Sequence, residues 1–224
     1  MRAKLSVVMP TLNAEAGLAR SLPALAEGLE AGLIRELVIS DGGSQDATGQ
    51  IAEAAGAVFV VGAASRGGQL RRGVRVARGE WLLVLHADSV LPPGWPEVVK
   101  AHIANGQGAA AFRLAFDSRG LAARVVAGWA NLRSKVFGLP YGDQGLLLSR
   151  FEYDDAGGYS DIPLMEDVAI AQALGRRITL LPATVTTSAE RYRRDGWLRR
   201  GGRNLLLLLR YLCGTRPEDL LRRY

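Results

Sequence analysis

The sequence is poor in the features that mark secreted and membrane-spanning chains. It has a single cysteine, Cys213, so an internal disulfide is excluded and nothing indicates an oxidising compartment. No run approaches the roughly 18 apolar residues that a spanning helix needs, and the longest aliphatic stretch covers 205–209. The apolar run after Arg2 and Lys4 is too short for a signal peptide. We therefore expect a cytoplasmic protein without a membrane span.

Aromatic RNA-binding signatures are also missing, although the formal net charge is +6. Such a charge suits nucleic acid, an anionic membrane surface or a phosphorylated substrate. The arginines gather in two places, 66–78 and 191–210. This distribution indicates a local phosphate site and a basic tail, with no nucleic-acid partner.

The chain is rich in apolar residues, which make up 48% of its 224 positions and can form the core of one α/β domain. In the first ninety residues strand and helix patterns alternate. We expect buried strands over 5–9, 37–40, 58–61 and 81–85, and helices over 15–30, 46–55 and 69–78, with Asp46 as a helix N-cap. The alternation predicts a Rossmann-like, mostly parallel sheet with helices on both faces.

The second half is less regular. It predicts strands over 109–116, 145–149 and 178–181, and helices over 121–137, 166–174 and 196–212. We expect one domain over 1–190, divided near residue 90 into a nucleotide-binding half and an acceptor half, and then a basic helical tail over 191–224. No internal repeat or low-complexity linker interrupts it.

Ligands of such sheets bind beyond the carboxyl ends of the parallel strands, where loops and helix N-termini converge. Three polar or glycine-containing loops follow predicted strands, at 10–13, 41–44 and 86–89. The sequence therefore predicts a binding site built from these three loops.

Two of these loops carry a resemblance. The stretches VVMPTLNAE (7–15) and LVISDGGSQD (37–46) are similar to the corresponding stretches of family 2 glycosyltransferases, which have the GT-A fold. The resemblance implies an enzyme that uses a nucleoside diphosphate sugar. It also implies that Asp41 hydrogen-bonds the base and that the first loop holds the nucleotide through Pro10, Thr11, Asn13 and Glu15. The alternative is a strand that ends in an ordinary Asx-type turn.

The stretch RGGQLRRG (66–73) precedes the fourth predicted strand and matches the donor-side loop of the family. The resemblance makes Arg66 and Gln69 nucleotide contacts. A helix N-terminus beside arginines also suits phosphate oxygens. The alternative is a glycine loop that caps a solvated basic helix.

The stretch LVLHADS (83–89) carries an acid from an apolar strand into a loop. The family usually has Asp-X-Asp here, and its last aspartate binds the Mn²⁺ or Mg²⁺ that bridges the diphosphate. By this resemblance Asp88 is a metal ligand, and Ala87 and Asp88 contact the nucleotide. His86 replaces the first aspartate, and three interpretations stay open: metal ligand, nucleotide contact or packed histidine.

The stretch LMEDVAI (164–170) places Glu166 and Asp167 before a helical pattern. Inverting members of the family carry such a pair here, and its aspartate is the general base, so the resemblance makes both residues catalytic candidates. The alternative is an ordinary acidic first turn. The stretch YGDQG (141–145) matches the place where the family admits the acceptor beside the donor sugar, which makes Asp143 and Gln144 candidates. Its alternative is a turn before a strand.

The basic tail contains two candidates for contact with the diphosphate, Arg191 and Arg194, because basic C-terminal loops close over it in some relatives. Its helix has leucines at 198, 205, 209 and 212 on one face and arginines at 199, 203 and 210 on another. We expect the leucines to pack on the domain. The alternative is contact with an anionic bilayer surface, which suits a lipid-linked acceptor.

These observations predict a transferase that moves a sugar from a UDP- or GDP-sugar to an acceptor hydroxyl, with inversion and a metal ion. A nucleotidyltransferase ranks second, because such enzymes open with a glycine-rich basic loop and this chain has 10-PTLN-13 instead. A dehydrogenase ranks lower, because no Gly-x-Gly-x-x-Gly follows the first strand. A non-catalytic basic protein that binds nucleotides or membranes is the alternative from another class.

Overall fold

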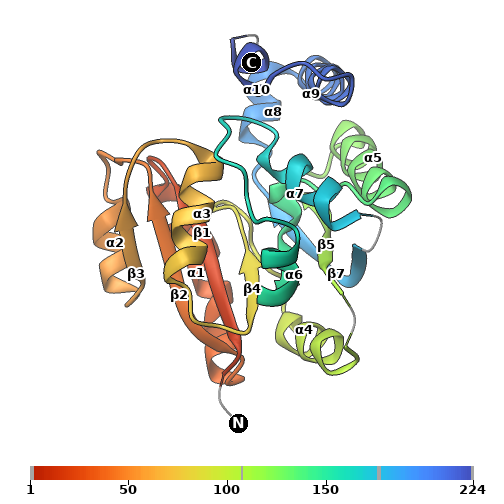
Figure 1. Cartoon of the computed structure of the whole chain (residues 1–224). Coiled ribbons are helices and arrows are strands. Elements are labelled where there is room, and N and C mark those ends of the chain that lie inside the picture. The colour runs from red at the N-terminus through yellow and green to blue at the C-terminus, as the bar shows by residue number, and fades with distance from the viewer. Residues whose placement is uncertain (1–2, 107, 176–177, 223–224) are drawn as a thin grey trace.

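The computed structural model describes residues 3–106, 108–175 and 178–222. Their centre is a seven-stranded sheet in the order β3-β2-β1-β4-β6-β5-β7 (Figure 1). The strands are β1 (Leu5–Thr11), β2 (Ile34–Asp41), β3 (Val58–Val61), β4 (Trp81–Val84), β5 (Ala110–Phe116), β6 (Leu146–Ser149) and β7 (Thr179–Thr187).

The first four strands are all parallel, as the alternating pattern predicts. Strand β6 is antiparallel to both β4 and β5, and β7 is parallel to β5. The sheet is therefore mixed but mostly parallel, and the carboxyl ends of β1, β2 and β4 meet at one edge.

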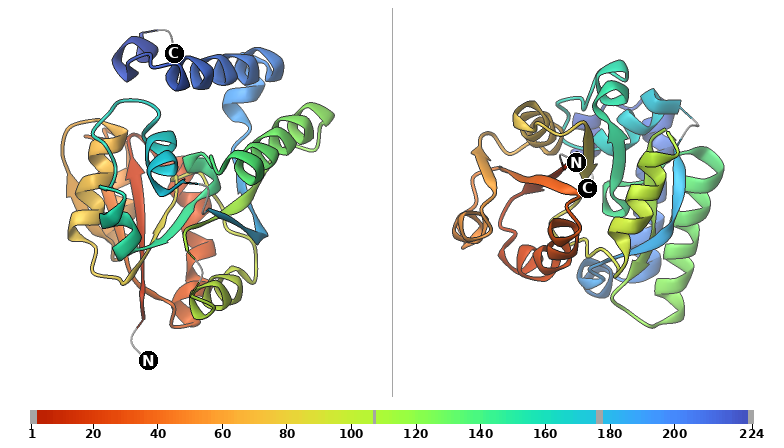
Figure 2. Two further views of the ribbon diagram at one scale, coloured as in Figure 1. Left: turned by 45° about the vertical axis from the view of Figure 1, so that its right-hand side comes forward. Right: turned by 90° about the horizontal axis from the view of Figure 1, so that it is seen from below.

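Helices cover both faces of the sheet (Figure 2). They are α1 (Glu15–Glu30), α2 (Thr48–Ala54), α3 (Arg66–Val76), α4 (Trp95–Ala104), α5 (Leu121–Phe137), α6 (Arg150–Asp155), α7 (Glu166–Leu174), α8 (Glu190–Asp195), α9 (Trp197–Leu212) and α10 (Pro217–Leu221), with a 3-10 turn η1 (Gly142–Gln144). Buried residues of α1, α2, α4 and α5 form one core cluster with the sheet, and those of α3, α6 and α7 form a second.

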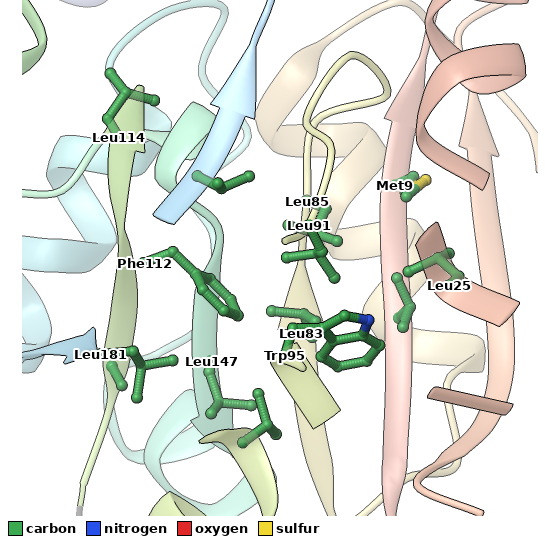
Figure 3. Close-up of a cluster of buried hydrophobic side chains, with 14 of the residues drawn as sticks. Met9, Leu25, Leu83, Leu85, Leu91, Trp95, Phe112, Leu114, Leu147 and Leu181 are labelled. Atoms are coloured by element: carbon green, nitrogen blue, oxygen red, sulfur yellow. The ribbon is translucent and has the colours of Figure 1, made fainter. Parts of the chain in front are cut away.

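Strand β1 shows why both clusters form. Val7 and Met9 lie in the first cluster and Val8 in the second, because successive side chains of a strand point to opposite faces. In the first cluster Trp95 is fully buried beside Leu83 (Figure 3), and its indole N–H donates to a main-chain oxygen of α1 at 2.9 Å. The indole therefore joins α4 to α1 on one face of the sheet.

Two local predictions are wrong. Strand β3 was expected to be buried, but it is the edge strand, and its Val58 and Val61 side chains are exposed. The N-cap of α2 is Ala47, not Asp46. Asp46 instead accepts hydrogen bonds from the N–H and the hydroxyl of Thr48, because it lies one residue before the cap.

The tail helices α8, α9 and α10 lie at the end of the molecule toward which β1 points (Figure 1). Helix α9 buries Leu207 and Leu208 in a cluster with Met165 and Val168, at the start of α7. The expected packing of leucines 198, 205, 209 and 212 is wrong, because the helix turns this face to solvent. No helix within the described ranges is long and apolar enough to cross a membrane.

Candidate active site

A cavity of about 530 Å³ lies beyond the carboxyl ends of β1 and β4. Loops after both strands, the start of α3 and parts of the tail form its wall. Nine of the residues expected from the sequence line it, namely Pro10, Thr11, Asn13, Arg66, Gln69, His86, Ala87, Asp88 and Arg191. The other seven, Glu15, Asp41, Asp143, Gln144, Glu166, Asp167 and Arg194, lie outside this wall.

The loop after β1 is held in place by the loop after β2. Asn13 has a left-handed backbone (φ 49°), and its side-chain oxygen accepts a hydrogen bond from the N–H of Gln45 at 2.8 Å. The N–H of Asn13 donates to the Ser44 hydroxyl at 2.8 Å. Glu15 accepts a hydrogen bond from the N–H of Ala47 at 3.2 Å, which makes it part of the same brace rather than of the wall.

Asp41 is buried, and its carboxylate is occupied by the protein itself. One oxygen accepts from the hydroxyls of Thr11 and Ser44, and the other from the N–H groups of Gly43 and Ser44. Burial raises its pKa, but these hydrogen bonds outweigh burial and the pKa is lowered. A carboxylate has about four acceptor positions. The structure therefore favours a role in shaping the loops over direct contact with a base.

Gln69 is almost fully buried at the start of α3. Its amide N–H groups donate to the carbonyl oxygens of Thr11 at 2.7 Å and Ser40 at 3.0 Å. Gln69 thus ties the ends of β1 and β2 together. A nucleotide in the cavity would touch a loop that Gln69 positions.

The start of α3 is shaped by the segment before α7. Ser65 is the N-cap, and its hydroxyl accepts from the N–H of Gly68 and donates to Asp161. A Cβ added to Gly67 would overlap the carbonyl oxygen of Ser160. Gly67 and Gly68 therefore let the start of α3 pack against the segment before α7. Arg66 reaches the cavity wall from the first turn of α3, where main-chain N–H groups favour anions.

Asp88 and His86 reach the cavity from the loop after β4. Burial, and then the charges of Arg66 and Arg191, lower the pKa of His86 to about 3, so its imidazole is neutral at pH 7. A neutral imidazole and one carboxylate can contribute two ligands to a divalent cation. No group of three or more His, Cys, Asp or Glu side chains gathers as a metal site in the parts of the chain that the structure describes. The residues fit a cation whose other ligands come from the diphosphate and water.

Gly142 links the cavity wall to Asp167. Its backbone lies directly against Nε2 of His86, where a Cβ would overlap the ring. Its N–H donates to Oδ2 of Asp167 at 2.9 Å. Oδ1 of Asp167 accepts from the N–H of Val168 at 2.8 Å. Both oxygens of the half-buried Asp167 carboxylate are thus held by main-chain N–H groups, and each oxygen keeps one further acceptor position.

Glu166 lies next to Asp167 but is only 1% exposed. Within the described part of the chain neither of its carboxylate oxygens has a hydrogen-bond partner, and the Arg66 Nε atom lies 3.5 Å from Oε1. Burial, and then the charge of Asp167, raise the pKa of Glu166 to about 7, while Arg66 acts in the opposite direction. The preceding residue, Met165, has a left-handed backbone (φ 66°), a strained conformation for a side chain of its size.

Asp143 and Gln144, in η1, differ in what they can do. Burial raises the pKa of Asp143 to about 6, and its buried Oδ1 has no hydrogen-bond partner among the residues that the structure describes. Gln144 is fully buried, and its amide bonds Ser134, Arg133, the N–H of Tyr141 and the carbonyl of Phe112. These hydrogen bonds hold the Gln144 side chain inside the protein, and its contact with acceptor or sugar stays a prediction.

The tail contributes one of its two expected arginines. Arg191 lines the cavity, whereas Arg194 is 74% exposed and pairs with Asp195 at 2.9 Å outside the wall. The sequence also gave no indication of several further wall residues, among them Arg20, Ser65, Pro163, Ser188, Glu190 and Leu221. Most come from segments far from the three predicted loops. Only the cluster of charges at 190–194 marked the tail as a neighbour of the site.

Comparisons with known proteins bear on the family and the fold. A family model described as glycosyl transferase family 2 matches residues 6–141. No curated protein sequence matches the chain.

Among solved structures, residues 1–349 of S. aureus TarS are 18% identical with a TM-score of 0.63, over 92% of this chain and 64% of that one. The mannosyltransferase PcManGT from Pyrobaculum calidifontis, in complex with GDP-Man and Mn²⁺, is 17% identical with a TM-score of 0.64, over 97% and 67%. Glucosyl-3-phosphoglycerate synthase from Mycobacterium tuberculosis, in complex with Mn²⁺ and UDP-glucose, is 22% identical with a TM-score of 0.55, over 83% and 70%. At these low identities, the structural similarity shows a shared fold. The chain spans less than two thirds of the length of the TarS fragment.

Proposed function

Because the chain belongs to glycosyl transferase family 2, we propose that it is an enzyme that transfers a sugar from a nucleoside diphosphate sugar to an acceptor hydroxyl. Structures with the same fold hold GDP-Man or UDP-glucose together with Mn²⁺. We therefore propose a UDP- or GDP-sugar as the donor, a divalent cation as cofactor and inversion at the anomeric carbon.

One observation carries this proposal: the wall of the cavity brings Asp88, Arg66 and Arg191 together beyond the ends of parallel strands. Arginine side chains and the first turn of α3 suit the oxygens of a diphosphate. The loop after β1, braced by Asp41 and Gln69, would hold the nucleoside. A Mn²⁺ or Mg²⁺ ion held by Asp88, with His86 as a second ligand, would offset the charge on the departing diphosphate.

Asp167 is the proposed general base. Its carboxylate accepts the proton of the acceptor hydroxyl while the acceptor oxygen forms a bond to the anomeric carbon. The bond from that carbon to the phosphate oxygen breaks, and the nucleoside diphosphate leaves with the electron pair. Attack from the side opposite the leaving group inverts the configuration. The N–H groups of Gly142 and Val168 hold the carboxylate for this step.

Glu166 is assigned a positioning role. It is too buried to reach an acceptor in this arrangement, but it lies 3.5 Å from Arg66, which lines the donor cavity. Arg66 would therefore connect the donor diphosphate to the pair of acids at the start of α7. Asp143 is the proposed contact for a hydroxyl of the donor sugar or the acceptor, because its buried Oδ1 has no partner in the described ranges.

The proposal is tested by titrating the protein with UDP, GDP, ADP and TDP, each with and without Mn²⁺. One base should bind more tightly than the others, and Mn²⁺ should increase its affinity. A panel of sugars on that nucleotide, scored by release of the nucleoside diphosphate, then identifies the donor. Equal binding of all four nucleotides, with a steep salt dependence and no effect of Mn²⁺, would instead indicate a basic surface without a donor site.

A further inference from the structure

Helix α5 has an apolar stripe on its outer side. Five exposed residues recur at spacings of three and four, which places them on one side of the helix: Leu121, Val125, Trp129, Leu132 and Val136. The other side of the helix, which includes Ala123, Ala127 and Ala130, is buried against the sheet. The stripe therefore lies on the side of α5 that faces away from the sheet.

Helix α9 has a second stripe of the same kind. Its exposed leucines are Leu198, Leu205, Leu206, Leu209 and Leu212, and Leu198 is 86% exposed. All of them except Leu206 lie on one side of the helix. The buried side of the helix carries Arg200, Leu207 and Leu208 instead. An apolar side that a helix turns to solvent is typical of helices that lie in a membrane interface.

The two stripes belong to adjacent helices. A Cβ added to Gly201 of α9 would meet Cγ2 of Val126 of α5 at 3.8 Å. In the left view of Figure 2, α9 (dark blue) crosses the top of the molecule, and α5 (green) runs up its side toward α9. We refer to the nine exposed residues of the two stripes as the apolar face. Soluble proteins rarely expose so many large apolar side chains together without an interaction that covers them.

The charges of the two helices have one sign. Helix α9 contains four arginines, helix α5 contains two arginines and a lysine, and neither contains an Asp or Glu. Arg124, Lys135 and Arg199 are exposed. Basic side chains beside an apolar stripe complement the negative surface of a bilayer with anionic lipids.

We propose that the apolar face docks on the surface of an anionic lipid bilayer, with α5 and α9 in the interface and their exposed basic residues Arg124, Lys135 and Arg199 at the phosphate level. A second copy of the chain is a poorer occupant. A two-fold contact would bring two basic helix pairs together without an acid in either helix to neutralise them.

Docking in this way has a consequence for the cavity. Its wall includes Arg191 and Leu221, which belong to the tail around α9. The cavity therefore lies at the same end of the molecule as the stripe of α9, which would bring it near a substrate held in the membrane. The docking proposal itself does not depend on the transfer reaction, because it concerns binding alone.

The test is co-sedimentation of the full chain with vesicles of phosphatidylcholine alone, and with vesicles that also contain about 30 mol % phosphatidylglycerol. The parent should bind the anionic vesicles, more weakly at high salt. The double variant Leu209→Gln, Leu212→Gln should lower the partition coefficient by roughly tenfold or more. Trp129→Gln should do the same from α5. Circular dichroism confirms that each variant is folded.

Leu29→Gln is the matched control. Leu29 is 59% exposed, but it lies at the last turn of α1, at the opposite edge of the sheet, so its substitution should leave vesicle binding unchanged. No binding of the parent to anionic vesicles would overturn the proposal. Equal binding by parent and leucine variants would overturn it too. A parent that is dimeric and ignores vesicles, with monomeric leucine variants, would assign the face to a second copy of the chain.

Discussion

The backbone of Gly142 lies against the imidazole of His86, with no room between them for a Cβ. The same glycine donates its N–H to Asp167 at 2.9 Å. One residue without a side chain thus sets the distance between a wall of the proposed donor cavity and the proposed base. His86 is consequently a packed residue on its Nε2 side, and it still lines the cavity.

Gly142→Ala should therefore damage the site. The added methyl must displace His86 or η1, at a cost of about 1–3 kcal/mol in the free energy of unfolding, and donor affinity should fall as well. Gly128→Ala is the control, because its Cβ meets open space within helix α5 and should stabilise the protein by about 0.5–1 kcal/mol. Urea unfolding and nucleotide titration measure both effects. A Gly142→Ala variant with the same free energy of unfolding and the same nucleotide affinity as the parent would contradict this packing.

Asp88→Asn should remove the increase in nucleoside diphosphate affinity that Mn²⁺ produces. The amide keeps the size of the side chain but loses the charge that a divalent cation requires. Glu190→Gln, at the other carboxylate of the cavity wall, is the control and should keep the Mn²⁺ effect. Titration calorimetry with and without Mn²⁺ decides. If Asp88→Asn responds to Mn²⁺ like the parent, the metal assignment fails.

Asp167→Asn should separate chemistry from binding. The amide cannot accept the acceptor proton, so transfer should slow by about 10² to 10⁴-fold while the donor dissociation constant changes little. Glu166→Gln should slow transfer less, because Glu166 is buried and acts through Arg66. Single-turnover rates and donor titrations distinguish the two variants. Full transfer by Asp167→Asn would exclude it as the base, and loss of donor binding would move it to the donor site.

The stability of the protein should depend on Glu166 and pH. Burial first, and then Asp167, raise its pKa from 4.5 to about 7 in the folded protein. Between about pH 4.5 and about pH 7, Glu166 is therefore protonated in the folded state and ionised in the unfolded state. Its contribution to the free energy of unfolding is fully present below about pH 4.5, falls as pH rises, and is lost above about pH 7.

Glu166→Gln cannot ionise, so the variant should gain stability over the parent as pH rises through this window. Urea unfolding at about pH 5 and about pH 8 measures the difference. The exposed Glu53→Gln variant on α2 is the control and should show no such trend. A difference between Glu166→Gln and the parent that is the same at both pH values would show that the carboxyl does not keep its proton in the folded state.

Much of the fold could be predicted because many of its helices and strands have an apolar pattern that is visible within the segment itself. The apolar period of α1 (Glu15–Glu30), α5 (Leu121–Phe137) and α7 (Glu166–Leu174) gave their bounds, and β3 was placed from its four apolar residues. Helix α4 (Trp95–Ala104) was missed, and so was the second half of β7. The latter contains Pro182, and its strand conformation depends on pairing with β5, which lies far away in the sequence.

The candidate site could also be predicted only in part. The topological rule brought the loops after β1 and β4 to one cavity, with Asp88 and Thr11 in its wall. It could not tell which polar side chains are free to bind. Gln69 bonds Thr11 across 58 positions, and Gln144 bonds Phe112 across 32, so both are occupied by partners that no local pattern reveals.

The most direct test of the account is a crystal structure of the chain with its preferred nucleoside diphosphate and Mn²⁺. The account predicts that the diphosphate lies between Arg66 and Arg191, that the nucleoside rests on the loop after β1, and that a carboxylate oxygen of Asp88 lies about 2.0–2.2 Å from the metal ion. A nucleotide bound elsewhere, or a metal ion held without Asp88, would contradict the assignment of this cavity as the donor site.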